Sequence, residues 1–313
     1  MIKNITVVGA GTMGHGIAHV FARAGYQVTL CDTYAPMLEI APEKMRQELQ
    51  FMADENYILQ ETVEETLNNI TICASVEEAT RNADYVIEAV RENLQVKKDL
   101  LAQLDKVCPK HTVFASNTSS LKLGEITADL PPERKKMCMI SHWYNPAYLI
   151  PIAELSKFGN MPEDVFQDVY DMYVKAEKKP VCVHKDVPGM IANRLLHALA
   201  REAFHLVETG VGDPKDVDNA LKFGPCFRNA TTGMLEVADM GGLDIWLAGE
   251  DNIFPALDTS AQACDTMRKL VEEGNLGIKS GKGFYEYPGD SGAKAQNAFY
   301  KRLIVQLKAS KNY

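Results

Sequence analysis

The sequence has no apolar run long enough to cross a membrane. A spanning helix needs roughly 20 consecutive apolar residues, and no stretch of this chain approaches that length. The opening segment MIKNITVVGAG also lacks the charged, apolar and small-residue regions that make up a signal peptide. These absences argue against a membrane partner and predict a cytoplasmic protein.

Paired cysteines and an excess of positive charge are missing too. The seven cysteines are odd in number and far apart, and no two form a C-x-x-C pair, so the sequence predicts neither a metal site nor a redox centre. The 42 acidic residues outnumber the 33 basic ones and give a net charge of -9. Because such a field repels a polyphosphate backbone, we expect no nucleic-acid partner, and any anionic ligand needs a local positive site.

The chain does contain enough apolar residues for two domains. It has 313 residues, 46% of them hydrophobic, a size at which chains commonly split into two cores. We expect residues 1–185 to form an α/β domain and residues 186–313 a helical one. The charged segment HKDVPGM, with its Pro-Gly break, suits the linker between them.

Strand and helix patterns alternate along the first domain. Ile5–Val8, a glycine-rich turn, a helical pattern and Val28–Cys31 make one βαβ unit, which implies a parallel sheet. Residues 36–69 follow a charged helical pattern and predict an inserted helical hairpin. Further strands are predicted at 70–73, 85–89, 112–115, 137–141 and 181–183, with helices between them at 76–81, 94–107 and 122–129.

The second domain differs because its strand patterns stop. Helices are predicted at 189–210, 214–222, 234–249, 259–273 and 295–309. The expected fold class is therefore α/β, a Rossmann-type doubly wound sheet with a second, all-helical domain.

The first glycine-rich turn indicates a cofactor site. Gly9, Gly11 and Gly14, with Thr12 and Met13 between the last two, form G-x-G-x-x-G after a strand and at the start of a helix. The first glycine permits the turn, the second lets a pyrophosphate approach the backbone, and the third lets helix and strand pack closely. The helix N-terminus adds amide donors for phosphate. Taken alone, such a turn can also be purely structural.

Asp32 makes the pattern more specific. It ends the second strand, 18 residues after Gly14 (32 minus 14), where a carboxylate accepts hydrogen bonds from ribose hydroxyls and repels a 2′-phosphate. The sequence therefore predicts NAD rather than NADP. The alternative for Asp32 is a solvated loop aspartate.

A second pattern, in residues 141–155, indicates a catalytic pair. The flanks MCMISH and IPIAEL are both strand-like, and the Asn-Pro pair between them is a turn signal. A hairpin centred near Tyr148 would place His142 and Glu154 level on opposite strands. A carboxylate at one imidazole nitrogen fixes the tautomer and leaves the other nitrogen to take a hydroxyl proton. The alternative is a buried histidine with a structural hydrogen bond.

Polar residues also follow a buried strand at Ser116–Ser120. Ligands in doubly wound folds bind at the carboxyl ends of strands. These hydroxyls and the Asn117 amide could therefore hold a substrate oxygen or the nicotinamide carboxamide. The same residues also suit a helix cap or a turn.

With these motifs in place, the chain resembles the L-3-hydroxyacyl-CoA dehydrogenase family from Ile5 to about Tyr287. The resemblance rests on GAGTMGHGIA, the acidic end of VTLCD, VIEAVRENLQVKK, FASNTSSL, SHWYNP followed by AEL, VPGMIANRLL and GIKSGKGFYEY. It implies NAD-dependent oxidation of a short-chain (S)-3-hydroxyacyl-CoA, with His142 as the base and Glu154 as its partner.

The same resemblance implies roles for further residues. Ser119 and Asn193 would lie near the substrate oxygen, and Asn145 at the substrate and nicotinamide end. Four residues would lie beside the cofactor: Glu92, Lys97, Ser119 and Lys279. Asn193 could instead cap the first helix of the second domain, and Lys279 could be a solvated cation. Family members are typically homodimers through the helical domain, with the small-molecule substrate in the cleft between domains.

Two departures from the family pattern concern the substrate. The family usually shows a Gly-Pro-Phe-Glu run before a Gly-Leu-Asp. This chain has Thr232–Glu236 and later Gly241–Asp244 at these places, so we expect a different wall of the acyl pocket. The hairpin at 36–69, which in the family carries basic residues toward the CoA phosphates, has only Lys44 and Arg46 against many acids. A free, non-CoA hydroxy acid or a hydroxymethyl compound is therefore the alternative substrate class.

Two other interpretations are weaker. The β-hydroxyacid dehydrogenases have a similar glycine signature but use a lysine on the interdomain helix, where this chain has Asn193 and Arg194. A catalytically silent NAD-binding or structural protein is the other alternative. The presence of both His142 and Glu154 argues against it.

Overall fold

The computed structural model describes residues 2–313. They form two compact units. The first comprises the chain up to Ile191 together with Leu303–Lys308, and the second comprises Ala192–Arg302 with Ala309–Tyr313. The first unit contains a sheet flanked by helices, and the second is helical.

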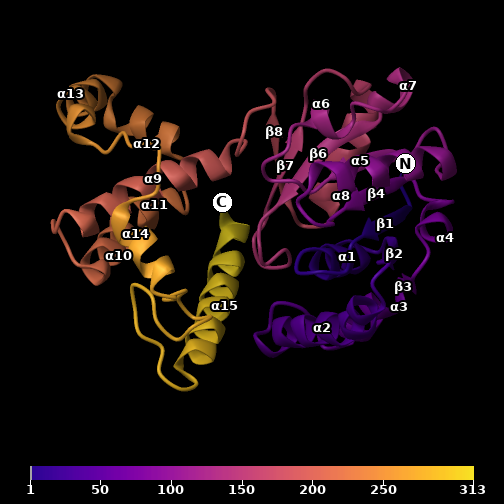
Figure 1. The fold of residues 1–313 in the computed structure, drawn as a ribbon, viewed down its shortest axis with the longest axis horizontal. Coiled ribbons are helices and arrows are strands. Elements are labelled where there is room, and N and C mark those ends of the chain that lie inside the picture. Colours follow the sequence, from indigo (N-terminus) through magenta and orange to yellow (C-terminus); the bar gives the residue numbers. More distant parts are fainter. Residues whose placement is uncertain (1) are drawn as a thin grey trace. The chain divides into compact units, whose positions relative to one another are not determined.

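One eight-stranded sheet forms the centre of the first unit (Figure 1). Its strands are β1 Asn4–Val8, β2 Gln27–Cys31, β3 Ile70–Cys73, β4 Tyr85–Glu88, β5 Val113–Ser116, β6 Cys138–Trp143, β7 Ile152–Ser156 and β8 Lys179–Val183. Their order is β3-β2-β1-β4-β5-β6-β7-β8. Neighbours from β3 to β6 pair in parallel, β7 is antiparallel to β6, and β8 is parallel to β7. The doubly wound sheet predicted from the sequence is confirmed.

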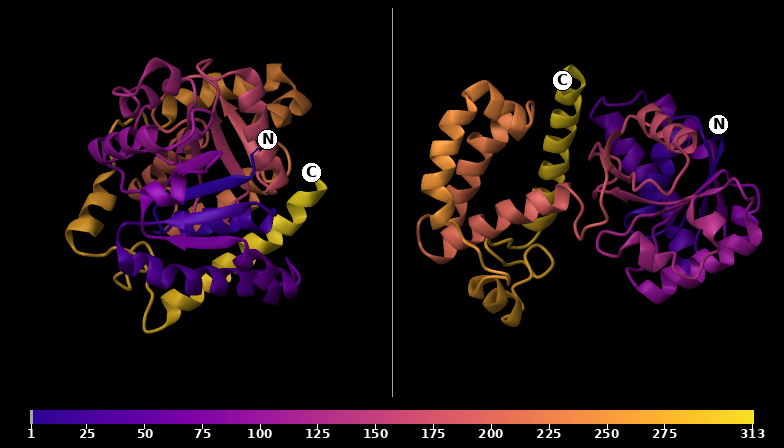
Figure 2. Two further views of the ribbon diagram at one scale, coloured as in Figure 1. Left: turned by 90° about the vertical axis from the view of Figure 1, so that its right-hand side faces the viewer. Right: turned by 90° about the horizontal axis from the view of Figure 1, so that it is seen from above.

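The central strands are buried on both faces. All four residues of β4 are buried, and β1 is buried from Ile5 to Val8. Near-continuous apolar strands of this kind are typical of parallel sheets covered on both sides, and Figure 2 shows helices flanking the sheet. Because β1 lies between β2 and β4, the direction of winding reverses there. Ligands of doubly wound folds bind beside the carboxyl ends of the strands at this point.

Helices connect the strands of the first unit. α1 (Gly14–Arg23) joins β1 to β2, and α2 (Ala35–Asp54) and α3 (Glu61–Asn68) lie between β2 and β3. The others are α4 Val76–Thr80, α5 Leu94–Val107, α6 Leu123–Ile126, α7 Pro132–Lys135 and α8 Glu163–Lys175.

α8 was not predicted from the sequence. Its buried side chains are Phe166, Val169, Met172 and Tyr173, which recur at helical spacing. Two acidic residues occupy its first turn, where they interact favourably with the helix dipole. These are ordinary signals of an amphipathic helix, and they are present in the sequence itself.

The second unit consists mainly of helices. They are α9 Ala192–Glu208, α10 Pro214–Phe223, α11 Pro225–Asn229, α12 Met234–Gly241, α13 Leu243–Ile253, α14 Asp265–Glu272 and α15 Ser291–Ala309, with 3-10 turns at Phe254–Ala256 and Ser310–Asn312. The single helix predicted for 234–249 is wrong. Gly242 has a φ of 91°, outside the helical range, and separates α12 from α13. Within residues 2–313, no helix combines the length and apolar character that a membrane crossing requires.

The C-terminal helix α15 contributes to both units. Its residues Leu303–Lys308 group with the first unit, where Ile304 and Leu307 are buried. Lys308 Nζ donates to the carbonyl oxygen of Glu55 at 2.5 Å. Because Glu55 directly follows α2, Lys308 contacts the end of that helix.

Candidate functional site

The three glycines of the first turn have different surroundings. Gly9 has a φ of 105°, and a Cβ there would lie 2.6 Å from the carbonyl oxygen of Ala89. A Cβ on Gly14 would lie 1.6 Å from the carbonyl oxygen of Gly9. The fold itself therefore requires glycine at both positions. A Cβ on Gly11 would meet nothing within 4 Å, so this glycine leaves open space beside the backbone.

The same turn presents amide groups that the chain does not use. The backbone N–H groups of Gly11, Thr12 and Met13 donate to no acceptor among residues 2–313. α1 begins at Gly14, and its positive dipole end lies on this side. Consecutive amides at the start of a helix bind phosphate. The open space at Gly11 and these three donors fit the pyrophosphate of a dinucleotide.

Asp32 lies directly after β2 and forms a hydrogen bond with this turn. Its Oδ2 accepts a hydrogen bond from the backbone N–H of Ala10 at 2.8 Å, and its Oδ1 accepts one from Tyr34 at 2.9 Å. Each carboxylate oxygen has capacity for a second bond. Ribose recognition by Asp32 stays a prediction, and its contact with the turn was not foreseen.

His142 and Glu154 face each other across two antiparallel strands. β6 and β7 pair with these two residues opposite each other, so the hairpin register predicted from the sequence is confirmed. His142 Nδ1 lies 2.8 Å from Glu154 Oε2, and both side chains are buried. Glu154 Oε1 accepts the backbone N–H of Ile191 at 2.9 Å. The carboxylate is thus held from two sides and fixes the imidazole.

The other imidazole nitrogen is available for chemistry. His142 Nε2 makes no hydrogen bond within the part of the chain that the structure describes. When Nδ1–H donates to a carboxylate, Nε2 of the neutral ring carries a lone pair. The arrangement makes His142 a proton acceptor at Nε2, as general-base chemistry requires.

Tyr144, which was not singled out from the sequence, packs beside this imidazole. The two ring centroids are 5.1 Å apart at an interplanar angle of 62°. Burial, with a contribution from the negative charge of Glu154, raises the pKa of Tyr144 to about 12. The phenol therefore stays protonated through the neutral pH range. Nothing in the motif SHWYNP distinguishes it from the neighbouring tryptophan, so its position had to come from the structure.

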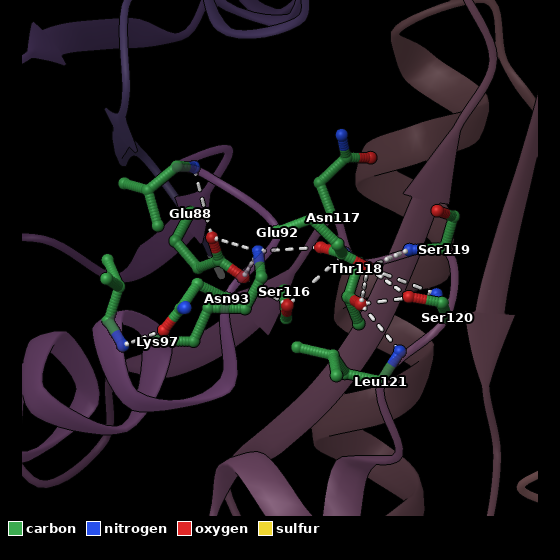
Figure 3. Close-up of polar contacts among 12 residues, drawn as sticks. Glu88, Glu92, Asn93, Lys97, Ser116, Asn117, Thr118, Ser119, Ser120 and Leu121 are labelled. Carbon is green, nitrogen blue, oxygen red and sulfur yellow. Dashed lines mark hydrogen bonds and ion pairs between the residues drawn. The ribbon is translucent and has the colours of Figure 1, made fainter.

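A buried ion pair lies beside the polar loop after β5 (Figure 3). Lys97 Nζ lies 2.8 Å from both carboxylate oxygens of Glu88, and both side chains are 1% exposed. Ser116 also hydrogen-bonds to Glu88. Burial raises the pKa of Glu88, while Lys97 and Ser116 oppose that rise. Lys97, which was predicted to lie beside the cofactor, is enclosed between Glu88 and Glu92, the latter at 3.4 Å.

Glu92 holds the loop of residues 118–120 through one carboxylate oxygen (Figure 3). Its Oε1 accepts hydrogen bonds from Thr118 Oγ1 at 2.5 Å, from Ser120 Oγ at 2.8 Å, and from the amides of Ser119 and Ser120 at 3.2 Å each. Burial favours the neutral acid, but these bonds and Lys97 outweigh it and lower the pKa of Glu92. Glu92 therefore fixes the backbone of Ser119, which remains exposed.

Most of the predicted residues belong to the first unit, where many of them follow the carboxyl ends of its parallel strands. Asn117 Oδ1 accepts the backbone N–H of Trp143 at 2.9 Å, which ties the loop after β5 to the strand that carries His142. Asn145 is exposed in the connection between β6 and β7. Two predicted residues belong to the second unit: Asn193, the second residue of α9, and Lys279, which is exposed. The roles of all these residues stay predictions.

Comparison with protein families finds two matching models. Residues 4–187 match the NAD binding domain of 3-hydroxyacyl-CoA dehydrogenase. Residues 189–287 match the C-terminal domain of 3-hydroxyacyl-CoA dehydrogenase. The matches follow each other along the chain and together cover most of it.

Two of the individual proteins that resemble the chain differ in the kind of substrate that their names give. A probable 3-hydroxybutyryl-CoA dehydrogenase from Bacillus subtilis is 36% identical over 287 residues, which cover 91% of this chain and 98% of that protein. A 5-formyl-3-hydroxy-2-methylpyridine 4-carboxylate 5-dehydrogenase from Mesorhizobium japonicum is 31% identical over 308 residues, 98% of each.

Two solved structures carry names of the same two kinds. The structure of a 5-formyl-3-hydroxy-2-methylpyridine 4-carboxylic acid 5-dehydrogenase, described as an NAD+-dependent dismutase, matches with a TM-score of 0.90 at 29% identity over 99% of both chains. The structure of an (S)-3-hydroxybutyryl-CoA dehydrogenase from Ralstonia eutropha matches with a TM-score of 0.74 at 28% identity, over 92% of this chain and 100% of that one.

Proposed function

The chain belongs to the 3-hydroxyacyl-CoA dehydrogenase family and is an NAD-dependent oxidoreductase, and from that premise we propose that His142 is its catalytic base, oriented by Glu154. The proposal rests on one observation. His142 Nδ1 pairs with buried Glu154 at 2.8 Å, which leaves Nε2 as the acceptor.

The proposed reaction is the reversible oxidation of an alcohol to a carbonyl compound. His142 Nε2 takes the hydroxyl proton as the hydrogen on the same carbon leaves as hydride, so that a C=O bond forms. NAD, when bound, accepts the hydride. Glu154 stabilises the imidazolium that results, and in the reverse direction the imidazolium returns the proton to the oxygen.

The remaining predicted residues have proposed binding roles that family membership supports. Residues of the glycine turn, Gly9 to Gly14, would hold the pyrophosphate of NAD. Ser119, Asn145 and Asn193 would contact the substrate end. Glu92 and Lys279 would lie on the cofactor side, and Lys97 would act through Glu92, since its ammonium is buried.

Asp32 would select NAD over NADP. Its carboxylate would accept bonds from the adenosine ribose and repel a 2′-phosphate. Asp32→Ala should therefore weaken NAD binding and relax the rejection of NADP. A parent protein that already prefers NADP would show this assignment to be wrong.

A short-chain (S)-3-hydroxyacyl-CoA is the first candidate substrate. Its support is the family itself and the 36% identity to a probable 3-hydroxybutyryl-CoA dehydrogenase. Its carbinol carbon bears the hydrogen and the hydroxyl that the dyad needs.

A free hydroxy acid or hydroxymethyl compound is the second candidate, and the charge of the α2–α3 hairpin favours it. The hairpin carries only two cations, Lys44 and Arg46. Arg46 is paired with Glu64 of α3, which leaves Lys44 to meet the phosphates of a CoA tail. The 5-formyl-3-hydroxy-2-methylpyridine 4-carboxylate 5-dehydrogenase, whose named substrate carries no CoA, also matches 98% of this chain, whereas the probable 3-hydroxybutyryl-CoA dehydrogenase matches 91%.

A substrate panel separates these candidates. NADH formation would be measured with 3-hydroxybutyryl-CoA, with free 3-hydroxybutyrate and with a hydroxymethylpyridine carboxylate. Turnover of the thioester alone supports the first candidate. A higher kcat/KM on a free acid, unchanged by added CoA, supports the second. If folded protein that binds NADH turns over none of them, both candidates are wrong.

We also propose that the second unit forms a homodimer. Within this described unit, helices α9 to α14 bury none of their residues, and large apolar side chains such as Phe223, Leu235 and Met240 are about three-quarters exposed or more. Exposed apolar surface of this extent marks an interaction site. Sedimentation at micromolar concentration should give a dimer mass, and a stable monomer would contradict the proposal.

A further inference from the structure

Two histidines of α1 share one carboxylate from α2. His15 Nε2 lies 3.1 Å from Glu48 Oε1, and His19 Nε2 lies 3.0 Å from Glu48 Oε2. His15 Nδ1 lies 2.6 Å from the carbonyl oxygen of Gly11, the second glycine of the cofactor turn. Both histidines are buried. This cluster connects the α2–α3 hairpin directly to the turn that would hold the pyrophosphate.

The two partners of His15 determine its charge. A carbonyl oxygen and a carboxylate oxygen can only accept hydrogen bonds, so both ring nitrogens must carry hydrogen if both bonds form. That state is the imidazolium. Burial lowers the pKa of His15, but the hydrogen bond and negative charge of Glu48, together with the Gly11 carbonyl, outweigh it and raise the pKa above its ordinary value.

The groups that face His15 are consistent with this charge. Burial raises the pKa of Glu48, but the hydrogen bonds from both histidines outweigh it and lower the pKa to about 2, so the carboxylate is ionised. Burial lowers the pKa of His19, whose Nδ1 has no hydrogen-bond partner, so His19 is neutral with its hydrogen on Nε2. The positive charge of Lys44 on α2 lowers the pKa of His15, but Glu48 raises it by more.

We propose that His15, as an imidazolium held by Glu48, is a positioning residue for the NAD-binding turn. In a trans peptide the C=O and N–H groups point in opposite directions. The bond that draws the Gly11 carbonyl toward His15 therefore directs the N–H of Thr12 away from it, and Thr12 is exposed. This N–H is one of the three amides that the chain leaves without an acceptor. The charge on His15 also adds to the positive end of the α1 dipole.

NADH affinity should consequently depend on pH. A neutral imidazole carries one hydrogen, so above its raised pKa His15 loses one of its two hydrogen bonds. The charged carboxylate of Glu48 is a stronger acceptor than the Gly11 carbonyl, so the remaining hydrogen stays on Nε2 and the bond from Nδ1 to Gly11 is the one lost. The pyrophosphate of NADH keeps its charge over the same range, so a change in affinity reports on the protein. The inference rests on the proposed placement of the NAD pyrophosphate at the glycine turn, but not on the substrate or on His142.

The test is the dissociation constant of NADH, measured by fluorescence with the full chain from about pH 6 to about pH 9. The parent should bind at least about tenfold more weakly at the alkaline end, the loss expected for one hydrogen bond to a charged group. His15→Asn cannot become charged, so its affinity should not change with pH. Glu48→Gln should move the midpoint to lower pH. Glu39→Gln, an exposed change on the same helix, should keep the parent profile.

Three results would overturn the proposal. The first is a parent whose NADH affinity is the same across the pH range, a result that does not depend on any variant folding. The second is a pH dependence that persists unchanged in folded His15→Asn. The third is an unmoved midpoint in folded Glu48→Gln. A merely structural role for His15 would weaken binding equally at every pH, and circular dichroism would show whether each variant is folded.

Discussion

Lys178 Nζ lies 4.3 Å from the centre of the Trp143 ring, the residue next to the proposed base. The same nitrogen donates to the carbonyl oxygens of Ala147 at 3.0 Å and Ile150 at 2.5 Å, in the connection between β6 and β7. Lys178 is buried, and burial lowers its pKa to about 7. Because a neutral amine has two hydrogens, the two carbonyls use both of them. Lys178 therefore fixes the connection between the two members of the dyad.

At about pH 9, where the amine of the folded protein is neutral, replacing Lys178 by methionine should destabilise the protein. The change removes the donor for two carbonyl groups in a buried connection, and each unsatisfied group costs about 1–3 kcal/mol. Urea unfolding would measure the loss. Lys179→Met is the matched control, because Lys179 is exposed and its replacement should change the free energy of unfolding by less than about 0.5 kcal/mol. Equal stability of the two variants would contradict the role of Lys178.

The lowered pKa of Lys178 also has a signature in the pH dependence of stability. The folded protein binds fewer protons at this group than the unfolded chain does between pH 7 and the ordinary lysine pKa of about 10.4. The contribution of Lys178 to the free energy of unfolding should therefore rise with pH across this window. Below about pH 7 the buried amine is protonated, and the full cost of burying its charge is present. The parent should gain stability over Lys178→Met from pH 7 to pH 9. A constant difference would show that the pKa is not lowered.

The glycines of the cofactor turn should respond differently to the same substitution. Gly14→Ala should destabilise the fold by several kcal/mol or prevent folding, because its Cβ would lie 1.6 Å from the carbonyl oxygen of Gly9. Gly11→Ala should fold with nearly parental stability, because its Cβ meets nothing within 4 Å. Its methyl group would occupy the space proposed for the pyrophosphate, so NADH binding should weaken by about tenfold or more.

Thermal unfolding and NADH titration of both glycine variants would check this contrast. Stable Gly11→Ala protein with parental NADH affinity would mean that the pyrophosphate does not approach the backbone there.

The register of the dyad could be predicted because it depends on local sequence. His142 and Glu154 lie equally far from Tyr148, and both flanks are strand-like, so a hairpin places them level. The parallel strands could be predicted for a similar reason, since each is a short apolar run next to a turn signal.

Contacts between distant segments could not be predicted in this way. Glu92 and the loop at 118–120 are separated by a helix and a strand, and Lys178 reaches carbonyls about 30 residues earlier. His15 meets Glu48 only because α2 packs against α1. No spacing rule links such positions, because the sheet and its covering helices decide which of them meet. The Gly241-Gly242 pair does mark the break at Gly242, but the apolar pattern on both sides of it also fits one continuous helix.

The most direct test of the account compares His142→Gln with the parent, using a substrate that the parent oxidises and measuring kcat and the NADH dissociation constant on the same preparations. If His142 is the base, kcat should fall by about a hundredfold or more while NADH affinity stays within about twofold of the parent. A His142→Gln protein that turns over as fast as the parent would contradict the assignment of His142 and Glu154.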